Sequence, residues 1–401
     1  MMKVVQINAT CGIGSTGKIC VGISRLMTAS GIENYILCSR TNGDTIGVSC
    51  SDDRAIRLQA LKSRVLGNYG FNSRKAARRM IEELERIQPD IVHLHNIHGH
   101  DCDLKTLFSY FKEQKTKLIW TFHDCWAFTG YCPHFTMVKC RKWKTQCGNC
   151  SQRREFSWFF DRSKELFEQK KELFTGLDMT IVTPSQWLAD LVRESFLKAY
   201  PVHVIHNGIN LSVFKPTHSD FRQRYGLEGK KLLLGVSFGW SPKKGVDVFL
   251  ELARRLPEEY RIVLVGTNEK LDKLLPEKIL SIHRTQNQQE LAQIYTAADL
   301  FVNPTREENY PTVNMEALSC GTPVLTFRTG GSPEIIDETC GAVVPCDDVD
   351  AMEREILRIC RDRPYSRESC LKKAGEFDQN ERFKEYLKLY ERVVFGRAES
   401  D

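Results

Sequence analysis

Apolar runs alternate with amphipathic segments over almost the whole chain of 401 residues. Runs of strand length occur at 3–9, 35–39, 91–96, 117–124, 180–184, 202–206, 231–238, 261–266, 279–284, 300–304, 323–327 and 341–345. Between them, apolar side chains recur at helical spacing at 73–87, 186–197, 246–256 and 287–297. Several of the strands are apolar on both faces, which predicts an α/β fold of parallel sheets covered by helices.

The twelve predicted strands exceed what one doubly wound sheet usually holds. The pattern therefore predicts two domains, each with a doubly wound sheet. The segment HNGINLSVFKP at 206–216 follows a strand, carries Asn-Gly turn chemistry and ends at Pro216. We therefore predict domains at 1–207 and 208–379, with a C-terminal helix at about 380–401 that packs back on the first domain. Because ligands of open α/β sheets bind beyond the carboxyl ends of the strands, functional residues are expected there.

Bulk composition narrows the class of protein. A net charge of +6, from 57 Lys and Arg against 51 Asp and Glu, does not by itself indicate a nucleic-acid partner, and we predict none. No apolar run reaches the length of a membrane span, and no signal-peptide pattern opens the chain, so we predict a cytoplasmic protein. Fifteen cysteines in such a protein favour reduced thiols or a metal site over disulfides.

Residues 54–79 are locally basic and contain no Asp or Glu. The cations are Arg54, Arg57, Lys62, Arg64, Arg74, Lys75, Arg78 and Arg79. Leu58, Leu61 and Val65 recur at helical spacing and are predicted on the other face. Two interpretations remain open: a solvated helix packed on its domain, or a basic face resting peripherally on an anionic membrane surface.

The stretch CGIGSTGKI at 11–19 follows the first predicted strand and fits G-x-x-x-x-G-K, the core of a phosphate-binding P-loop. The motif requires Ser or Thr where this chain has Ile19. A P-loop ATPase is therefore a remote alternative, which leaves the second domain without a role. Gly14 and Gly17 at a helix start also suit close approach of the backbone to another kind of phosphate.

The segment 303–336 carries two glutamates in the spacing E-x7-E, Glu308 and Glu316, at the end of a predicted strand. Pro311 suits the first turn of a helix, which places Glu316 inside that helix and Glu308 in the loop before it. The helix start offers N–H groups and a partial positive charge to a diphosphate. Carboxylates beside such a site suit neutral hydroxyls, as on a ribose or a hexose.

This segment resembles the signature of family-4 retaining nucleotide-sugar glycosyltransferases, which have the GT-B fold of two Rossmann-like domains facing across a cleft. The matching motifs are EALSCGTPV at 316–324, Gly330-Gly331, YTAAD at 295–299 and HNGIN at 206–210. The resemblance covers essentially the whole chain. Where the family usually has G-F-G, this chain has NYP at 309–311, and it resembles the subgroup that builds colanic acid and other bacterial exopolysaccharides.

The resemblance implies roles for individual residues. Glu316 would bind the ribose of the donor nucleotide and Glu308 the hydroxyls of the donor sugar. Lys244 matches the lysine that holds the donor diphosphate, and Lys243 would supply the charge of an arginine that is missing near Phe238. His123 would face the donor sugar, ahead of His93 and His95. We take Glu308, His123 and Lys244 as catalytic, and the other donor-binding residues as Glu316, Lys243, Gly14, Gly17, Asn309, Tyr310, Thr312 and Val313.

The implied reaction is transfer of a sugar, with retention, from a nucleotide-sugar to a saccharide or lipid-linked acceptor in bacterial surface polysaccharide biosynthesis. Its front-face mechanism has no obligatory catalytic metal. The missing arginine keeps two alternatives open on the same fold: a sugar-nucleotide epimerase and a non-catalytic nucleotide-sugar-binding subunit.

Cysteines concentrate directly after His123. Cys132, Cys140, Cys147 and Cys150 follow the spacing C-x7-C-x6-C-x2-C, and the CGNC turn is a good half-site for zinc. We predict a structural zinc held by these four, with His134 as a substitute ligand and free reduced thiols as the alternative.

Overall fold

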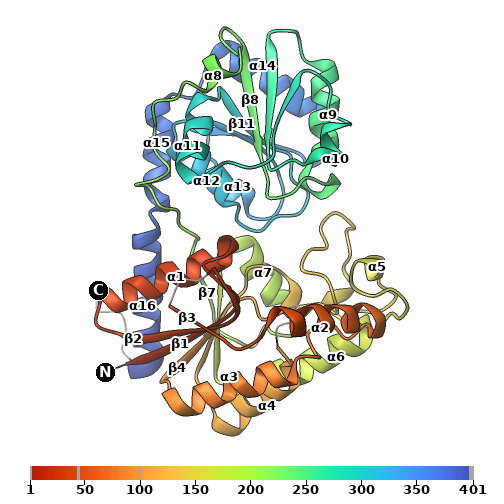
Figure 1. The fold of residues 1–401 in the computed structure, drawn as a ribbon, viewed down its shortest axis with the longest axis vertical. Coiled ribbons are helices and arrows are strands. Elements are labelled where there is room, and N and C mark those ends of the chain that lie inside the picture. Colours follow the sequence, from red (N-terminus) through yellow and green to blue (C-terminus); the bar gives the residue numbers. More distant parts are fainter. Residues whose placement is uncertain (1, 43–45, 99, 101, 397–401) are drawn as a thin grey trace. The chain divides into compact units, whose positions relative to one another are not determined.

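The structure is a computed structural model that describes residues 2–42, 46–98, 100 and 102–396 (Figure 1). The chain folds as two compact units. The N-terminal unit comprises Met1–His206 with Arg382–Asp401, and the C-terminal unit comprises Asn207–Glu381. Among the described residues, no helix has both the length and the apolar character that crossing a membrane requires.

The described part of the N-terminal unit contains a seven-stranded parallel sheet in the order β3-β2-β1-β4-β5-β6-β7. Its strands are β1 (Lys3–Cys11), β2 (Glu33–Thr41), β3 (Gly47–Ser49), β4 (Ile91–Leu94), β5 (Leu118–Thr121), β6 (Met179–Thr183) and β7 (Val202–Val204). The short edge strand β3 is absent from the sequence-based assignment, because three residues are too few to show a period.

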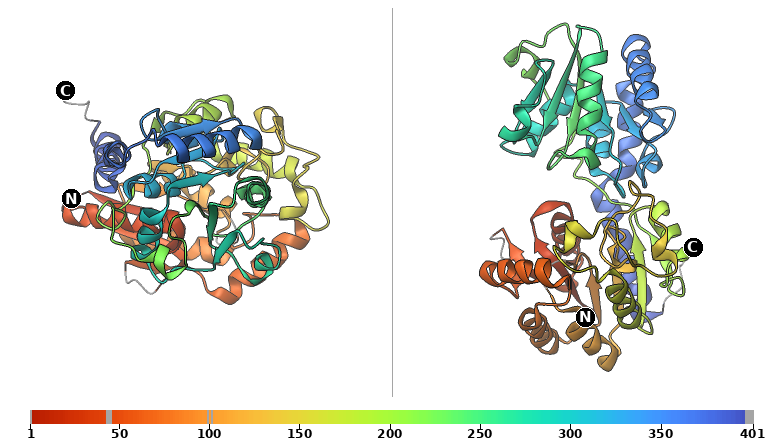
Figure 2. Two further views of the ribbon diagram at one scale, coloured as in Figure 1. Left: turned by 90° about the horizontal axis from the view of Figure 1, so that it is seen from above. Right: turned by 90° about the vertical axis from the view of Figure 1, so that its right-hand side faces the viewer.

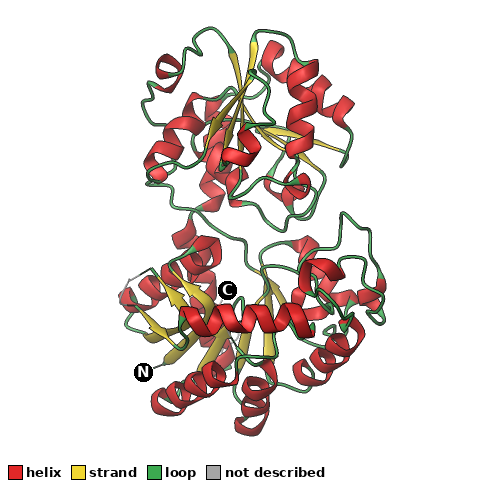
Figure 3. Ribbon diagram, turned by 45° about the vertical axis from the view of Figure 1, so that its right-hand side comes forward, coloured by secondary structure: helices red, strands yellow, loops and turns green. Residues whose placement is uncertain are grey.

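Helices cover both faces of this sheet (Figure 3). They are α1 (Gly14–Ala29), α2 (Asp53–Leu66), α3 (Arg74–Ile87), α4 (Leu104–Gln114), α5 (Arg153–Phe156), α6 (Ser163–Phe174), α7 (Gln186–Glu194) and most of α16 (Gln379–Phe395), with 3-10 turns η1 (Trp126–Phe128) and η2 (Lys142–Lys144). Successive strand residues point to opposite faces, so Val4 and Val5 enter two different hydrophobic clusters. This explains why the strands are apolar throughout.

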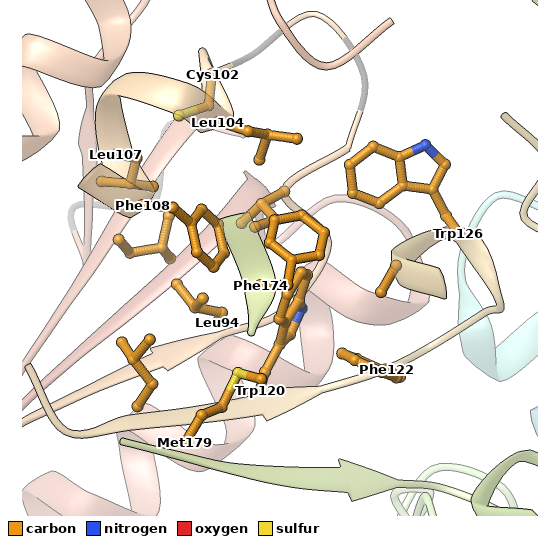
Figure 4. Packing of buried hydrophobic residues seen from close by; sticks show 14 of the residues in the cluster. Leu94, Cys102, Leu104, Leu107, Phe108, Trp120, Phe122, Trp126, Phe174 and Met179 are labelled. Atoms are coloured by element: carbon orange, nitrogen blue, oxygen red, sulfur yellow. The ribbon is translucent and has the colours of Figure 1, made fainter. Parts of the chain in front are cut away.

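One face of the sheet packs against α3, α4, α6 and α7 around a group of aromatic rings (Figure 4). The ring centroids of Phe108 and Phe174 lie 4.5 Å apart, and the Trp120 ring meets Phe174 edge-on at 4.9 Å. The Trp120 indole N–H donates to the carbonyl of His95 at 2.9 Å, which satisfies the one polar atom of this ring. Aromatic packing therefore holds the segment that directly follows β4 and contains His95.

The opposite face packs against α1 and α16, so the end of the chain belongs to the core of the N-terminal unit. Phe383 and Tyr390 on α16 are almost completely buried with Ile19 and Ile23 of α1. A side chain at Gly22 would place its Cβ 2.3 Å from the Phe383 ring, so only glycine permits this approach.

The described C-terminal unit contains a six-stranded parallel sheet in the order β10-β9-β8-β11-β12-β13 (Figure 2). Its strands are β8 (Lys231–Val236), β9 (Tyr260–Val265), β10 (Ile279–Ile282), β11 (Leu300–Asn303), β12 (Val324–Phe327) and β13 (Gly341–Val344). Its helices are α8 (Phe221–Arg224), α9 (Val246–Arg255), α10 (Glu269–Asp272), α11 (Gln288–Ala297), α12 (Thr312–Ser319), α13 (Ser332–Ile335), α14 (Val349–Asp362) and α15 (Arg367–Ala374), with 3-10 turns η3 (Pro242–Lys244) and η4 (Gly375–Phe377). The predicted pair of doubly wound parallel sheets is confirmed.

The basic stretch 54–79 differs from its prediction. It is not one helix: α2 ends at Leu66, capped by Gly67 with φ +67°, and α3 begins at Arg74. The leucines predicted to pack on the domain face solvent, since Leu58 and Leu61 are each 51% exposed. Helical spacing showed which residues share a face of α2, but not whether that face is buried. The buried residues of α2 are Ile56 and Ser63.

The glycine-rich turn after β1 does not have the geometry of a P-loop. β1 continues to Cys11 and α1 begins at Gly14, so Gly17 and Lys18 lie inside the helix rather than at its entrance. Ile19, the residue that breaks the motif, is 7% exposed and packs in the core. These observations oppose the ATPase alternative.

Candidate functional site

Because both sheets are parallel, the carboxyl ends of the strands in each unit meet at one edge. In the C-terminal unit this edge carries the loops after β8, β11 and β12. In the N-terminal unit it carries the loops after β1, β4 and β5. The predicted site residues lie on these loops and on the helices that follow them.

In the C-terminal unit, the lysines after β8 meet the glutamates after β11. The Lys244 Nζ lies 2.6 Å from the Glu308 Oε2, and the Lys243 Nζ lies 3.2 Å from the Glu307 Oε2. Each lysine side chain remains 36% exposed, so the cations sit at the rim rather than in the core. Gly245, at φ +74°, permits the approach, because a Cβ there would lie 2.3 Å from the Pro304 carbonyl.

Glu307 is a candidate site residue that the sequence analysis missed. Its side chain is 3% exposed, and its Oε1 has no hydrogen-bond partner among the described residues. A buried carboxylate oxygen without a partner is costly, so it marks a place where a ligand or water donor would be stabilising. The signal was the adjacent Glu307-Glu308 pair, of which the E-x7-E spacing used only one.

In the described part of the C-terminal unit, three further buried polar side-chain atoms lack a partner, and all three follow β11 or β12. They are the Asn314 Nδ2 on α12, the Thr329 Oγ1 after β12 and the Ser332 Oγ at the start of α13. Polar groups that are buried and unpaired at one edge of a sheet are typical of a ligand site rather than of a core.

Glu316, the second glutamate of the E-x7-E spacing, is held by a hydrogen bond from a buried tyrosine. The Tyr295 hydroxyl donates to the Glu316 Oε2 at 3.0 Å. Burial raises the pKa of Tyr295 well above its usual value, with the Glu316 charge adding to the effect, so the hydroxyl keeps its proton. The tyrosine of the YTAAD motif therefore positions Glu316, while its Asp299 pairs with Arg222 at 2.7 Å and braces the fold.

α12 begins at Thr312, directly after Pro311, and no side chain caps its first N–H groups. Thr312 and Val313 thus lie where the sequence places a diphosphate site. Asn309 and Tyr310, by contrast, are 4% and 5% exposed, so their side chains belong mostly to the packing of the loop.

The Gly330-Gly331 turn after β12 packs against the backbone of the loop that carries Glu308 and Asn309. A Cβ at Gly330, which has φ +56°, would lie 1.9 Å from the Glu308 carbonyl oxygen. The Gly331 N–H donates to the Asn309 carbonyl at 2.6 Å. The double glycine therefore allows the β12 loop to hold the backbone of Glu308 in place.

Arg306 organises the same loop without replacing the missing arginine. Its guanidinium pairs with Asp247 at 2.8 Å and also with Asp347. Its backbone N–H donates to the Lys243 carbonyl at 2.9 Å. Two carboxylates and a carbonyl thus engage Arg306, and the cations at the rim of this loop are the two lysines.

In the N-terminal unit, a buried hydrogen-bond chain leads to His123. The Gln6 Nε2 donates to the Cys20 carbonyl at 3.0 Å, which turns the Gln6 Oε1 toward the His95 Nε2 at 3.0 Å. His95 must then donate from Nε2, and its Nδ1 accepts from the His123 Nε2 at 3.2 Å. The chain fixes the tautomer and ring orientation of His123.

These histidines are held neutral. Burial lowers the pKa of His123 to about 4, and burial with the neighbouring histidine charges lowers the pKa of His95 well below its usual value. Burial likewise lowers the pKa of His93 to about 3. His93 contacts the Tyr390 hydroxyl at 2.6 Å and the Thr121 Oγ1 at 2.8 Å, so it ties α16 to the sheet. His93 is thus a structural residue, whereas His123 is partly exposed.

Asp124, the residue after His123, places a carboxylate at the carboxyl edge of the N-terminal sheet. Its Oδ2 lies 2.8 Å from the His98 Nε2, and its Oδ1 accepts the Trp126 N–H at 2.8 Å. Burial alone would raise the Asp124 pKa, but His98, His134 and the Trp126 N–H outweigh it and lower the pKa to about 2. Asp124 therefore stays ionised and forms part of the lining of a small hollow of about 10 Å³ with His98 and His123.

The loop after β1 places Gly14 at the first position of α1 and Gly17 one turn later. A Cβ at Gly17 would lie 2.9 Å from the Thr10 Oγ1, so glycine lets the helix sit against the end of the strand. No side chain caps α1, which leaves its first N–H groups for a ligand or for water.

The predicted zinc site is not supported. Among the described residues, no group of three or more His, Cys, Asp or Glu side chains could hold a metal ion. Burial raises the pKa of Cys132 to about 12 and that of Cys147 to about 11, which favours protonated thiols over metal-binding thiolates. The loop is held instead by stacking of Phe135 on Trp143, with ring centroids 5.0 Å apart. The free-thiol alternative fits, since all four cysteines are free.

With this geometry in view, comparison with known proteins identifies the class. Residues 17–213 match the model of Glycosyltransferase Family 4, and residues 230–362 match that of Glycosyl transferases group 1. The two ranges together span most of the chain, and the chain belongs to this family of glycosyltransferases. The resemblance inferred from the E-x7-E segment is therefore confirmed.

Among curated proteins, the chain is 25% identical over 272 residues to WcaC of Escherichia coli (strain K12), named as a colanic acid biosynthesis glycosyl transferase. That match covers 65% of each chain, and other curated relatives are matched over 57% and 43% of their lengths.

Two solved structures share the fold over nearly the full chain. Sucrose-phosphate synthase from Thermosynechococcus elongatus is 16% identical, with a TM-score of 0.71 over 99% of this chain and 100% of its own. Anabaena HepE in complex with UDP-glucose is 15% identical, with a TM-score of 0.68 over 97% of this chain and 100% of its own.

Proposed function

We propose that the protein transfers a sugar from a nucleotide-sugar donor to a saccharide or lipid-linked acceptor. The observation that carries this proposal is the edge of the C-terminal sheet, where Lys244 and Glu308 pair at 2.6 Å beside the uncapped start of α12. A cation, a set of helix N–H groups and carboxylates suit a ligand that is anionic at one end and rich in hydroxyls at the other.

In this proposal the donor lies along the carboxyl edge of the C-terminal sheet. Lys243, Lys244 and the N–H groups of Thr312 and Val313 bind the diphosphate, and Glu316, held by Tyr295, accepts hydrogen bonds from the ribose. Glu308 and the neighbouring Glu307 then accept from the hydroxyls of the sugar. UDP-glucose bound to HepE, a protein of the same fold, supports a nucleoside diphosphate sugar as the donor class.

The proposed chemical step is a front-face substitution with retention. The bond between the anomeric carbon and the diphosphate oxygen breaks while the acceptor hydroxyl oxygen bonds to the same face of that carbon. The acceptor proton passes to the departing phosphate oxygen. Lys244 stabilises the charge that develops on the leaving group, which is the electrostatic contribution expected of a positioned cation. His123, kept neutral, binds a sugar hydroxyl, and the departing phosphate oxygen serves as the base.

The acceptor is proposed to belong to bacterial surface polysaccharide biosynthesis. The similarity to WcaC supports this class of pathway. A lipid-linked saccharide would bring the enzyme to the cytoplasmic face of a membrane.

The test is donor binding by thermal shift with UDP-, GDP-, ADP- and dTDP-sugars, since a ligand that binds only the folded state raises the melting temperature. One donor class should stabilise the wild type, and Glu316→Ala should lose at least about tenfold in affinity, or about 1.4 kcal/mol. Glu277→Ala, an exposed glutamate of the same unit, is the matched control. Equal donor binding by Glu316→Ala and the wild type would refute the donor-site assignment.

Turnover is measured separately with the best donor. Formation of a glycosidic product on a saccharide acceptor supports transfer, and the anomeric configuration of that product tests retention. A changed donor sugar in the absence of acceptor would instead identify an epimerase, and binding without any product a non-catalytic subunit.

A further inference from the structure

Three consecutive aromatic residues stand out on the surface of the N-terminal unit. Trp158, Phe159 and Phe160, between α5 and α6, are 52%, 61% and 56% exposed. Large aromatic side chains normally bury most of their area, so three exposed in a row mark a candidate interaction surface.

The exposed face of α2 continues this apolar area. Leu58 and Leu61 are 51% exposed and lie one helical turn apart, opposite the buried Ile56 and Ser63. By helical spacing the same outer half of α2 carries the cations Arg54, Arg57 and Lys62. Apolar and basic side chains therefore share one solvent-facing surface, without any acidic residue from 54 to 79.

The aromatic segment is fixed to the end of α2 rather than loosely attached. The Trp158 N–H donates to the Arg64 carbonyl at 2.8 Å. The Tyr131 hydroxyl donates to the Gly67 carbonyl at 3.0 Å and accepts the Arg162 N–H at 2.9 Å, which joins the start of α6 to the same turn. Leu66, 45% exposed, lies at this junction. We call Leu58, Leu61, Leu66 and Trp158–Phe160 the α2–aromatic surface.

We propose that the α2–aromatic surface docks the protein on a bilayer that contains anionic lipids. The aromatic rings and leucines enter the interface between headgroups and acyl chains, where tryptophan and phenylalanine are stabilised, and the α2 cations meet the anionic headgroups. Charge complementarity selects this occupant: beyond Asp53 at its first position, all the charged residues of α2 are cations, and an apolar protein groove would not require such a run. The inference goes beyond the proposed reaction and needs neither donor nor acceptor.

The first experiment is flotation of the full chain with vesicles of phosphatidylcholine alone or mixed equally with phosphatidylglycerol. The wild type should float with the anionic vesicles and much less with the neutral ones. The triple variant Trp158→Ser/Phe159→Ser/Phe160→Ser should lose at least about tenfold in vesicle affinity. Leu274→Ser removes an apolar side chain that is 69% exposed in the C-terminal unit and should bind as the wild type does.

The second experiment separates membrane insertion from misfolding. Of the six tryptophans, Trp158 alone is among the large apolar residues exposed in the described chain. Vesicles with brominated acyl chains should quench the wild-type fluorescence, and Trp158→Phe should keep its vesicle affinity but lose this quenching.

Three results would overturn the proposal: equal vesicle binding by the triple variant and the wild type, quenching that persists in Trp158→Phe, or a wild-type dimer that ignores vesicles and dissociates in the triple variant. The last outcome would show that the α2–aromatic surface joins two copies of the chain. An unchanged circular dichroism melting curve confirms that the triple variant is folded.

Discussion

The two units share one architecture, yet the lysines near the carboxyl edges of their sheets differ in exposure and in partners. At the C-terminal edge, Lys243 and Lys244 are 36% exposed and paired with carboxylates. At the N-terminal edge, Lys170 is fully buried and donates to the carbonyls of Trp126 at 2.8 Å and Thr129 at 3.0 Å. His93 and His123 of the same unit are held neutral by burial. A parallel sheet fixes where ligands bind, and the polarity of its loops decides whether that place suits an anion or neutral hydroxyls.

The largest effect is expected from removing the cation of the C-terminal edge. Lys244→Ala should lower kcat/KM by about 10²–10³, or about 3–4 kcal/mol, because the leaving diphosphate loses its positioned charge and Glu308 loses its ion-pair partner. Steady-state kinetics with the identified donor measure the loss. Lys270→Ala, an exposed lysine of the same unit, is the control.

The double variant Lys244→Ala/Glu308→Gln sharpens this result. Because the two side chains are in contact, their losses should sum to less than the separate values. Strict additivity would contradict a shared role at the diphosphate.

The next effect tests by pH whether the buried histidine His93 of the N-terminal unit is neutral. A histidine with a folded pKa of about 3, against 6.5 in the unfolded chain, binds fewer protons when folded. The contribution of His93 to the free energy of unfolding is therefore fully present above about pH 6.5 and is lost as the pH falls toward 3. His93→Gln should make this slope shallower by up to about 1.4 kcal/mol per pH unit.

Urea denaturation between pH 7 and pH 4 checks the slope, with His218→Gln of the C-terminal unit as the control. If the wild type and His93→Gln lose stability equally on acidification, His93 is not neutral in the folded state, and the contrast between the two edges fails at this point.

A third effect concerns the loop that carries Glu308. Gly330→Ala should cost about 1–3 kcal/mol of stability, because alanine is strained at φ +56° and its Cβ meets the Glu308 carbonyl. Gly375→Ala is the matched control, since Gly375 is in a helical conformation with nothing within 4 Å of its Cβ position. Thermal denaturation measures both variants, and equal melting temperatures would show that the β12 loop does not hold Glu308.

The fold followed from the sequence because strands buried on both faces leave an unmistakable apolar run, and their ends were predicted to within a few residues. Contacts between distant residues left no such trace. Tyr295 reaches Glu316, and Gln6 reaches His95, only once the sheets are assembled.

Side-chain direction and local chemistry were the points at which prediction failed. The period of α2 gave a leucine stripe without saying that it faces solvent, as Leu58 does. The cysteine spacing suggested zinc at Cys132, where burial favours the protonated thiol. A pattern specifies which residues share a face, whereas packing decides what that face meets.

The smallest effect, and the finest test of the contrast, comes from Lys170. Its Nζ lies 3.4 Å from the centroid of the Trp126 ring, and burial lowers its pKa well below the usual value. Lys170→Met keeps most of the volume but removes the Nζ hydrogen bonds to the two carbonyls, while it also removes the cost of a buried amine. These terms oppose one another, so we expect a net loss of only about 1 kcal/mol. Lys171→Met, the exposed neighbour on α6, should be neutral in the same chemical denaturation. A variant more stable than the wild type would mean that burying the amine costs more free energy than its hydrogen bonds contribute. The N-terminal edge would then retain Lys170 for its charge near Asp124 rather than for stability.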